Sequence, residues 1–222
     1  MLFRSQSLTA HKDIVTCLAI SSNESCLVSG SRDTTLLVWE MLTPKGAPLR
    51  VNESPLFILY GHSDDVTCVA IDVGCDICVS GSKDGTCIVH NLRNGTYLRT
   101  IPHPLRLGIE LLAISALGHI VFFSQEDLTL FVYTINGEFI SQSLTKGVVR
   151  VLCLSRDAKF VVTGEHDTLC IYNLFTLECI QRIPLEDAIV SITLNPDDVC
   201  ILAALANGNL VSVIITGYAQ LS

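Results

Sequence analysis

The 222-residue sequence predicts an all-β protein in which a four-stranded sheet is repeated along the chain, as in the blades of a β-propeller. Two observations predict this fold. A segment that begins at Ala10-His11 is nearly repeated from Gly61-His62, and both copies continue into apolar residues that favour strands. Each copy is then followed by a Ser-Gly-Ser-basic-Asp run, at 29–33 and at 80–84. Self-similarity at this spacing indicates a fold assembled from repeats.

The first repeat carries four polar side chains in the pattern typical of a WD40 blade: His11, Ser29, Asp33 and Trp39. An indole N–H inside a sheet is a donor that needs an acceptor. We therefore expect a hydrogen-bond chain in which Asp33 accepts from His11, His11 meets Ser29, and Ser29 meets the indole of Trp39. The same side chains could be read as a His–Asp–Ser catalytic set, but their spacing recurs with the repeat, which favours a structural role.

Later repeats keep only part of this set. In the second, His90 stands where Trp is expected, and the third and fifth keep still less. We predict that the remaining polar residues hold their own blades together in the same way. They are His62, Ser80 and Asp84 in the second repeat and Thr163 and Asp167 in the fourth.

Five repeats emerge when the chain is aligned on the small residue of each second strand, which places Ser124 and Ala203 with Ser29. The prediction is one WD40 propeller domain over residues 1–222, because spacings of about 40 residues match the WD40 period. The predicted blades are 10–60, 61–101, 102–142, 143–183 and 184–218.

Five blades are fewer than the seven or eight with which most WD40 rings close. Residues 2–8 read as the outer strand of a preceding or closing blade. They could pair with the strands expected at 189–215 and close a five-bladed ring. Alternatively, the chain is a fragment or short isoform of a longer propeller, so that the seven- or eight-bladed ring is incomplete. We favour the second expectation, although an unclosed ring would leave an apolar blade face exposed.

Composition limits the classes of function. The formal net charge of −8 and the lack of a basic run argue against nucleic acid as a partner. Residues 1–7 lack the apolar core of a signal peptide. The ten cysteines read as free packing thiols of a reducing compartment, and we expect no metal or cofactor. Residues 199–222 carry no charge, but Asn207-Gly208 in their middle predicts a hairpin in preference to a membrane span.

Several sequence segments resemble the C-terminal propeller of neurobeachin-type BEACH–WD40 proteins. They are residues 29–35 with Trp39, 80–86 with His90, 118–121 and 135–137, and the resemblance runs from about 9 to 144. It implies a non-catalytic scaffold in vesicle trafficking or membrane-protein sorting. It also implies a cytoplasmic location with peripheral association at endomembranes, made through other domains of a longer protein, because the PH-like and BEACH domains of that family are absent here.

A propeller of this kind offers a top face, formed by the loops that carry His11 and Asp33. Basic residues on adjacent blades, Arg32 and Lys83, point to a partner protein or an acidic or phosphorylated peptide, because such side chains pair with carboxylate and phosphate. The alternative is that Arg32 and Lys83 are ordinary solvated surface charges without a partner-binding role. The other candidate residues of this face are His166, Asp13 and Asp64.

Two other classes of function stay open. A substrate receptor of a cullin-type ubiquitin ligase often carries Trp-Asp-x-Arg at the end of the third strand, whereas residues 39–42 lack the Arg. A phosphoinositide-binding propeller of the autophagy type would need an Arg-Arg pair, which the sequence does not contain. An enzyme would need a pocket constellation that the repeats leave unexplained, and we identify none.

Overall fold

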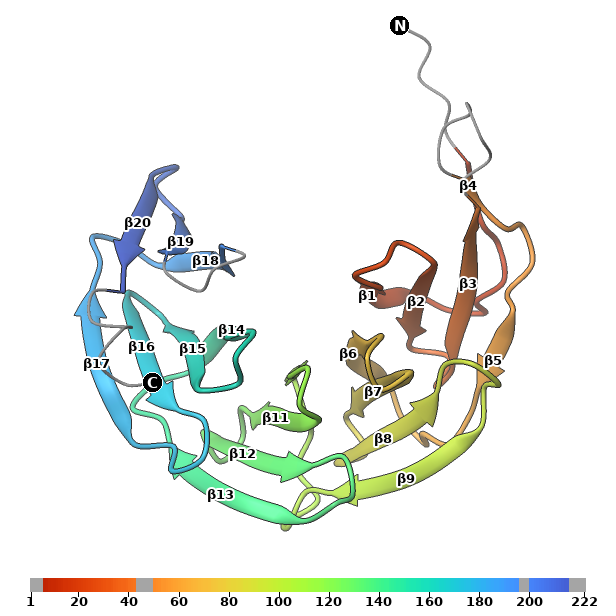
Figure 1. Cartoon of the computed structure of the whole chain (residues 1–222), viewed down its shortest axis with the longest axis horizontal. Coiled ribbons are helices and arrows are strands. Elements are labelled where there is room, and N and C mark those ends of the chain that lie inside the picture. Colours follow the sequence, from red (N-terminus) through yellow and green to blue (C-terminus); the bar gives the residue numbers. More distant parts are fainter. Residues whose placement is uncertain (1–5, 43–49, 196–199, 216–222) are drawn as a thin grey trace, which may run out of the picture.

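In the computed structural model, residues 6–42, 50–195 and 200–215 are described. Within them the chain forms five antiparallel sheets that follow one another in sequence order. Figure 1 shows the sheets as an open arc, with the first strand of each sheet toward the centre and β9, β13 and β17 on the outside. The all-β fold of mostly four-stranded blades is therefore confirmed.

The sheets of blades 2 to 5 are meanders, because their consecutive strands pair in order. Blade 1 contains β1 (Val15–Ile20), β2 (Cys26–Ser31), β3 (Leu36–Leu42), β4 (Arg50–Val51) and β5 (Phe57–Leu59), of which β4 and β5 both pair with β3. Blade 2 contains β6 (Val66–Asp72), β7 (Ile77–Ser82), β8 (Thr86–Asn91) and β9 (Tyr97–Pro102).

The last three blades follow the same order. Blade 3 contains β10 (Leu111–Ile114), β11 (His119–Ser124), β12 (Thr129–Thr134) and β13 (Phe139–Leu144). Blade 4 contains β14 (Val149–Leu154), β15 (Phe160–Glu165), β16 (Thr168–Asn173) and β17 (Cys179–Pro184). Blade 5 has three strands among the described residues, β18 (Ile189–Leu194), β19 (Cys200–Leu205) and β20 (Leu210–Ile214).

Apolar side chains fill the spaces between neighbouring blades. In the described part of the chain they form four clusters, one for each pair of adjacent sheets. Between blades 1 and 2, for example, Val28 of β2 lies in one cluster with Val66 and Cys78 of the next sheet. Both faces of an inner blade are therefore covered, which explains why these strands read as apolar runs without strict alternation.

The blades approach so closely that some positions admit only glycine. A Cβ added at Gly81 of β7 would lie 2.7 Å from Cys68 Sγ of β6 and 2.8 Å from Ile109 Cγ2 of blade 3. Cys68 is buried, and burial raises the pKa of its thiol to about 12. All ten cysteines are free. Cys68 therefore acts here as a small packing group.

Threonine hydroxyls link the inner strands of blades 1 to 3. Thr16 Oγ1 of β1 lies 2.5 Å from the carbonyl oxygen of Val66 on β6. Thr67 of β6 makes the same contact with the carbonyl of Ile109, just before β10. Both threonines sit at an irregularity in the pairing of the first two strands, where a bulge re-aims the side chain. Each hydroxyl thus joins one blade to the next.

The two ends of the arc expose apolar side chains. On the blade 1 side, Leu18 and Ile20 of β1 are 63% and 60% exposed, and on the blade 5 side Leu210 and Ile214 of β20 are 69% and 64% exposed. An unclosed ring was expected to leave such faces uncovered.

At the N-terminal side, residues 6–8 form no strand, so this part of the outer strand predicted at 2–8 is not present; residues 2–5 lie outside the described residues. The amide side chain of Gln6 instead donates to the carbonyl of Val51 at 2.7 Å. The hairpin predicted around Asn207-Gly208 is confirmed, because β19 pairs antiparallel with β20. In the described residues, no helix has the length and apolar character needed to cross a membrane.

Candidate functional site

The predicted hydrogen-bond chain is present in blade 1. The indole N–H of Trp39 donates to Ser29 Oγ at 2.9 Å, and Ser29 Oγ lies 2.8 Å from His11 Nε2. His11 Nδ1 lies 3.0 Å from Asp33 Oδ2. With a neutral imidazole protonated on Nδ1, every donor along this chain has an acceptor. The four residues therefore lock the loop before β1 onto strands β2 and β3.

Asp33 is the acceptor at the end of this chain. Burial by itself would raise the pKa of Asp33, but hydrogen bonds from Thr35, the Lys12 backbone N–H and His11 outweigh it and lower the pKa to about 2. The carboxylate is therefore ionised across the neutral range and serves as an acceptor for several donors at once.

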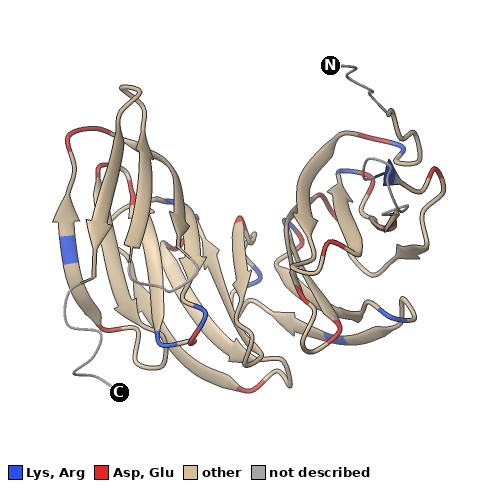
Figure 2. Cartoon of the chain, turned by 45° about the horizontal axis from the view of Figure 1, so that its top comes forward, with Lys and Arg blue, Asp and Glu red and all other residues tan. Residues whose placement is uncertain are grey.

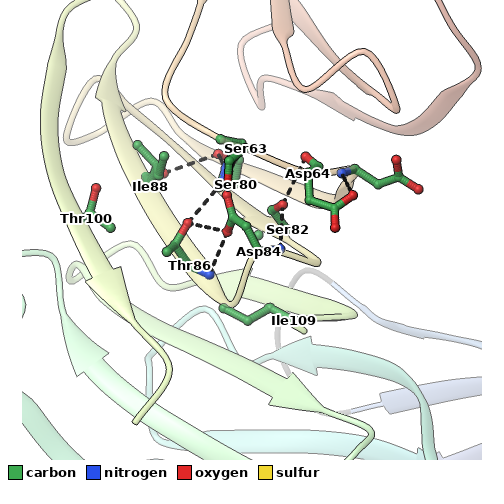
Figure 3. Close-up of polar contacts among 12 residues, drawn as sticks. Ser63, Asp64, Ser80, Ser82, Asp84, Thr86, Ile88, Thr100 and Ile109 are labelled. Carbon is green, nitrogen blue, oxygen red and sulfur yellow. Dashed lines mark hydrogen bonds and ion pairs between the residues drawn. The ribbon is translucent and has the colours of Figure 1, made fainter. Parts of the chain in front are cut away.

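Blade 2 keeps the chain without the indole, and Figure 3 shows Ser80 and Asp84 of this blade. His62 Nδ1 lies 3.1 Å from Asp84 Oδ2, and His62 Nε2 lies 2.9 Å from Ser80 Oγ. Asp84 also accepts from the backbone N–H of Ser63 at 2.9 Å. His90, at the position of Trp39, turns away from Ser80 and places its Nε2 3.1 Å from the carbonyl oxygen of Tyr60. The second blade thus fixes the same loop with a different partner for the third strand.

Blade 3 contains a histidine that the sequence analysis did not identify. His103 lies in the loop before β10, and its side chain is fully buried. Its Nδ1 accepts from the backbone N–H of Leu105 at 3.1 Å, so Nε2 carries the proton and faces Asp127 Oδ2 at 3.3 Å. His103 therefore takes the place of His11 and His62 with its ring reversed. A histidine 24 residues before the turn Asp, against 22 in blades 1 and 2, was the available signal.

The alignment of Ser124 with Ser29 is wrong. Tyr133 pairs with Ile120 as Trp39 pairs with Leu27, so the residue that corresponds to Ser29 is Phe122. Phe122 lies five residues before Asp127, whereas Ser29 lies four residues before Asp33, so the segment that leads into the turn of blade 3 is one residue longer, which shifted the alignment. Phe122 packs against the ring of His103 at a centroid distance of 6.2 Å, so a ring contact replaces a hydroxyl hydrogen bond.

In blade 4 the predicted pair Thr163 and Asp167 is not joined. Thr163 Oγ1 is buried and has no hydrogen-bond partner in the described structure, whereas Asp167 is exposed and accepts from Thr168 Oγ1 at 3.1 Å. The physical reason is that the loop before β14, residues 145–148, contains no histidine to bridge them. The fourth blade does not use the chain seen in blades 1 and 2.

A buried carboxylate holds blade 4 together in place of that chain. The hydroxyl of Tyr172, at the Trp39 position, donates to Glu165 Oε1 at 2.5 Å. Arg182 of the outer strand donates to Glu165 Oε2 at 3.3 Å and so balances its charge. Burial, and the nearby carboxylate, raise the pKa of Tyr172 well above its ordinary value. Glu165, Tyr172 and Arg182 thus tie the last three strands of the sheet together.

The candidate residues of the top face are brought together only in part. Arg32 and Lys83 approach the same carboxylate, because Asp65 Oδ2 lies 3.6 Å from Arg32 Nε and 2.9 Å from Lys83 Nζ. Asp13 and Asp64 accept hydrogen bonds from the backbone N–H of the residue that follows each of them. His166 lies apart in blade 4 and approaches Asp167 at 3.7 Å.

Charged side chains cluster in the loops and turns, while most strand segments carry none (Figure 2). The ion pair of Asp65 with Arg32 joins the loop before β6 to the turn after β2 and so links blade 2 to blade 1, whereas the ion pair with Lys83 lies within blade 2. An acidic peptide bound by Arg32 and Lys83 would have to displace Asp65. A partner-binding role for these two residues stays a prediction.

Comparison with known proteins fits the geometry of the blades. A model of the family described as "Neurobeachin beta propeller domain" matches residues 4–220. The chain belongs to this family.

Curated relatives of this neurobeachin-type propeller are much longer proteins. BEACH domain-containing protein B of Arabidopsis thaliana is 34% identical over 220 residues, covering 92% of this chain and 8% of that protein. BEACH domain-containing protein lvsE of Dictyostelium discoideum is 28% identical, covering 91% and 10%. WD repeat- and FYVE domain-containing protein 4 of Homo sapiens is 32% identical, covering 68% and 5%. The chain thus spans about a tenth or less of each of these relatives.

The buried histidines of the neurobeachin-type propeller predict that acid weakens it. Burial lowers the pKa of His62, His90 and His103 below the ordinary 6.5, against the opposing effect of a nearby carboxylate or carbonyl. The unfolded chain therefore binds more protons than the folded one below about pH 6.5, and the free energy of unfolding falls as the pH drops. Asp33, whose pKa is about 2, keeps its contribution until far lower pH.

Urea unfolding at pH 7.5, 6.5 and 5.5 measures this effect. We expect the free energy of unfolding to decrease at each step toward acid. The control variant His166→Gln alters an exposed histidine and should show the same decrease. A free energy that stays level or rises toward pH 5.5 would contradict the assignment of the three buried imidazoles as neutral.

Proposed function

We propose that this neurobeachin-type propeller is a non-catalytic protein-interaction scaffold that acts in vesicle trafficking or membrane-protein sorting. Membership of the neurobeachin propeller family supports the proposal, as do relatives described as BEACH domain-containing proteins. The proposed location is the cytoplasmic side of endomembranes, with contact to the membrane made by other parts of a longer protein.

The single observation that carries the proposal is that the His, Asp and Ser side chains of blades 1 and 2 are engaged in structural hydrogen bonds. Their polar atoms lie in hydrogen-bond chains that join loop to strand within one blade, as from His11 to Trp39. These His, Asp and Ser side chains thus stabilise the fold, and we assign the function to the surface of the blades. Proteins built from stacked repeats present extended surfaces that bind partners.

Proximity labelling in cells tests the proposal on the whole protein that carries this chain. We expect the labelled proteins to be enriched in vesicle-coat components and sorted membrane proteins. The Asp84→Ala variant, which removes an acceptor of blade 2, should lose this enrichment per molecule of protein, while Asp167→Ala at the matching position of blade 4 should keep it.

Two results would contradict the proposal. Labelling dominated by cullin adaptors would favour a ubiquitin-ligase substrate receptor instead. An identical labelled set for the wild-type protein and for Asp84→Ala would mean that the propeller does not contribute the interactions.

A further inference from the structure

The residue near the start of each inner strand is a threonine in blades 1 and 2 but not in blades 3 to 5. In blades 1 and 2 the residue at the start of the inner strand is Thr16 or Thr67, whose hydroxyl reaches a carbonyl of the next blade. Thr16 contacts the carbonyl of Val66, the residue just before Thr67, and Thr67 contacts the carbonyl of Ile109, the residue just before Glu110. Glu110 in blade 3 therefore corresponds to Thr67 in blade 2. The linking position in blade 3 is therefore occupied by Glu110, which has no hydroxyl to form the link.

Blades 4 and 5 show the same replacement. The first two strands pair with an irregularity between Val149 and Val151 in blade 4, and between Ile189 and Ser191 in blade 5, as they do at Thr16 and Thr67. The bulged residues are therefore Arg150 and Val190. A bulge re-aims a side chain and is often found beside functional sites. The last three blades have thus exchanged a hydroxyl that links blades for a carboxylate, a guanidinium and an apolar group.

A hollow lies where these residues meet. It has a volume of about 520 Å³, which is within the range of small-molecule pockets, and it spans the rim of blades 3 to 5 at the starts of β14 and β18. Its apolar lining includes Val148 and Val190, both exposed. Its polar lining comes from Glu110, Gln125 and Arg150.

The charge at the blade 3 side of the hollow is negative. Glu110 Oε2 accepts from the backbone N–H of Gln125 at 2.8 Å, which uses one of the several acceptor sites of a carboxylate. Partial burial, followed by the nearby charges of Glu126 and Asp127, raises the pKa of Glu110. A cation placed beside Glu110 would relieve this repulsion. Arg150, on the neighbouring blade 4, makes that part of the hollow unfavourable for a second cation.

We propose that this hollow binds a segment of a partner protein in which a lysine or arginine stands next to an apolar residue. The cation pairs with Glu110, and the apolar side chain lies on Val148 and Val190. Arg150 repels the cation from the blade 4 part of the hollow and so fixes the direction of the segment. The inference rests on the proposed role of the chain as a protein-binding domain, and it assigns that role to residues other than Arg32 and Lys83.

The test uses two pools of fluorescent hexapeptides that differ at one position. One pool has Lys or Arg before a central Val, Leu or Ile, and the other has Gln in place of the cation. Fluorescence polarisation of each pool is measured with the purified chain and with three variants. Glu110→Gln removes the charge but keeps an acceptor for Gln125, and Glu110→Thr installs the residue type of blades 1 and 2. Glu138→Gln removes an exposed carboxylate from a turn on the other rim of blade 3.

We expect the chain to prefer the basic pool and both Glu110 variants to bind it at least tenfold more weakly, with Glu138→Gln unchanged. Equal binding of the two pools, no binding of either, or an equal effect of Glu138→Gln would overturn the proposal. Thermal melting of each variant identifies loss through unfolding, and Glu110→Thr keeps the test valid if Glu110→Gln alone is unstable. If the pools fail while proximity labelling of the whole protein succeeds, only this hollow is excluded and the scaffold function stands.

Discussion

Replacing Gly81 with valine is expected to lower the free energy of unfolding by about 3 kcal/mol, the upper end of the usual cost of overpacking. Even a single added Cβ would lie 2.7 Å from Cys68 Sγ and 2.8 Å from Ile109 Cγ2. Atoms at such distances must move, and both neighbours, Cys68 on β6 and Ile109 just before β10, are buried in the interface between blades 2 and 3. Valine adds two further carbons to the same space, so the sheets would have to separate.

A matched control and a double variant sharpen this prediction. Gly147→Ala places its Cβ in open space, so its free energy of unfolding should change by no more than about 0.5 kcal/mol. Removing one of the crowded atoms should recover part of the loss, so Gly81→Ala with Cys68→Ala should cost less than the two single changes together. Urea unfolding measures the wild type, the four single variants and the double variant. A loss for Gly81→Val no larger than for Gly147→Ala would show that the blades are not in close contact here.

Replacing Asp84 with alanine is expected to cost about 3 kcal/mol, because it leaves the buried imidazole of His62 and three further donors without this acceptor. Asp84 lies 3.1 Å from His62 Nδ1 and accepts from the Ser63 backbone N–H at 2.9 Å. It also accepts from the Thr86 backbone N–H at 2.8 Å and from Thr86 Oγ1 at 2.6 Å. One substitution therefore removes the partner of four donors (Figure 3).

Asp167→Ala provides the comparison, because Asp167 holds the turn position of blade 4 and is exposed. Its removal should change the free energy of unfolding by no more than about 0.5 kcal/mol. Asp84→Asn keeps the shape and one acceptor oxygen, so it should fall between the wild type and Asp84→Ala. Chemical unfolding at neutral pH distinguishes these outcomes. Equal losses for Asp84→Ala and Asp167→Ala would mean that the hydrogen bonds of blade 2 carry no special weight.

Sequence reasoning succeeded where the network is local and each residue type allows few alternatives. His11, Ser29, Asp33 and Trp39 come from one repeat and meet by simple antiparallel pairing. The strand boundaries follow from the same repeat, because turn residues separate each apolar run from the next. The five sheets span residues 15–59, 66–102, 111–144, 149–184 and 189–214.

Sequence reasoning failed in blades 3 and 4, where other residue types replace the His–Ser–Asp set of the first two blades. In blade 3 the longer segment before the turn places Phe122 at the serine position. The histidine of this blade was missed because His103 follows Pro102, whereas His62 of blade 2 follows a glycine. In blade 4, Glu165 stands where the Ser-Gly-Ser run ends in blades 1 and 2, and it is neutralised by Arg182, seventeen residues further along. The hollow at Glu110 was missed as well, since it depends on three blades that meet only in the folded chain.

The open arc also determines how stability is shared along the chain. Each inner blade is covered by a neighbour on both sides, whereas blades 1 and 5 have one described neighbour each, and blade 5 has three described strands. In such a row, cooperativity passes only between adjacent units, as in linear repeat proteins. Blade 5 can therefore fray as a separate unit while blades 2 and 3 stay intact, so the wall of the hollow that contains Val190 is the least rigid part of it.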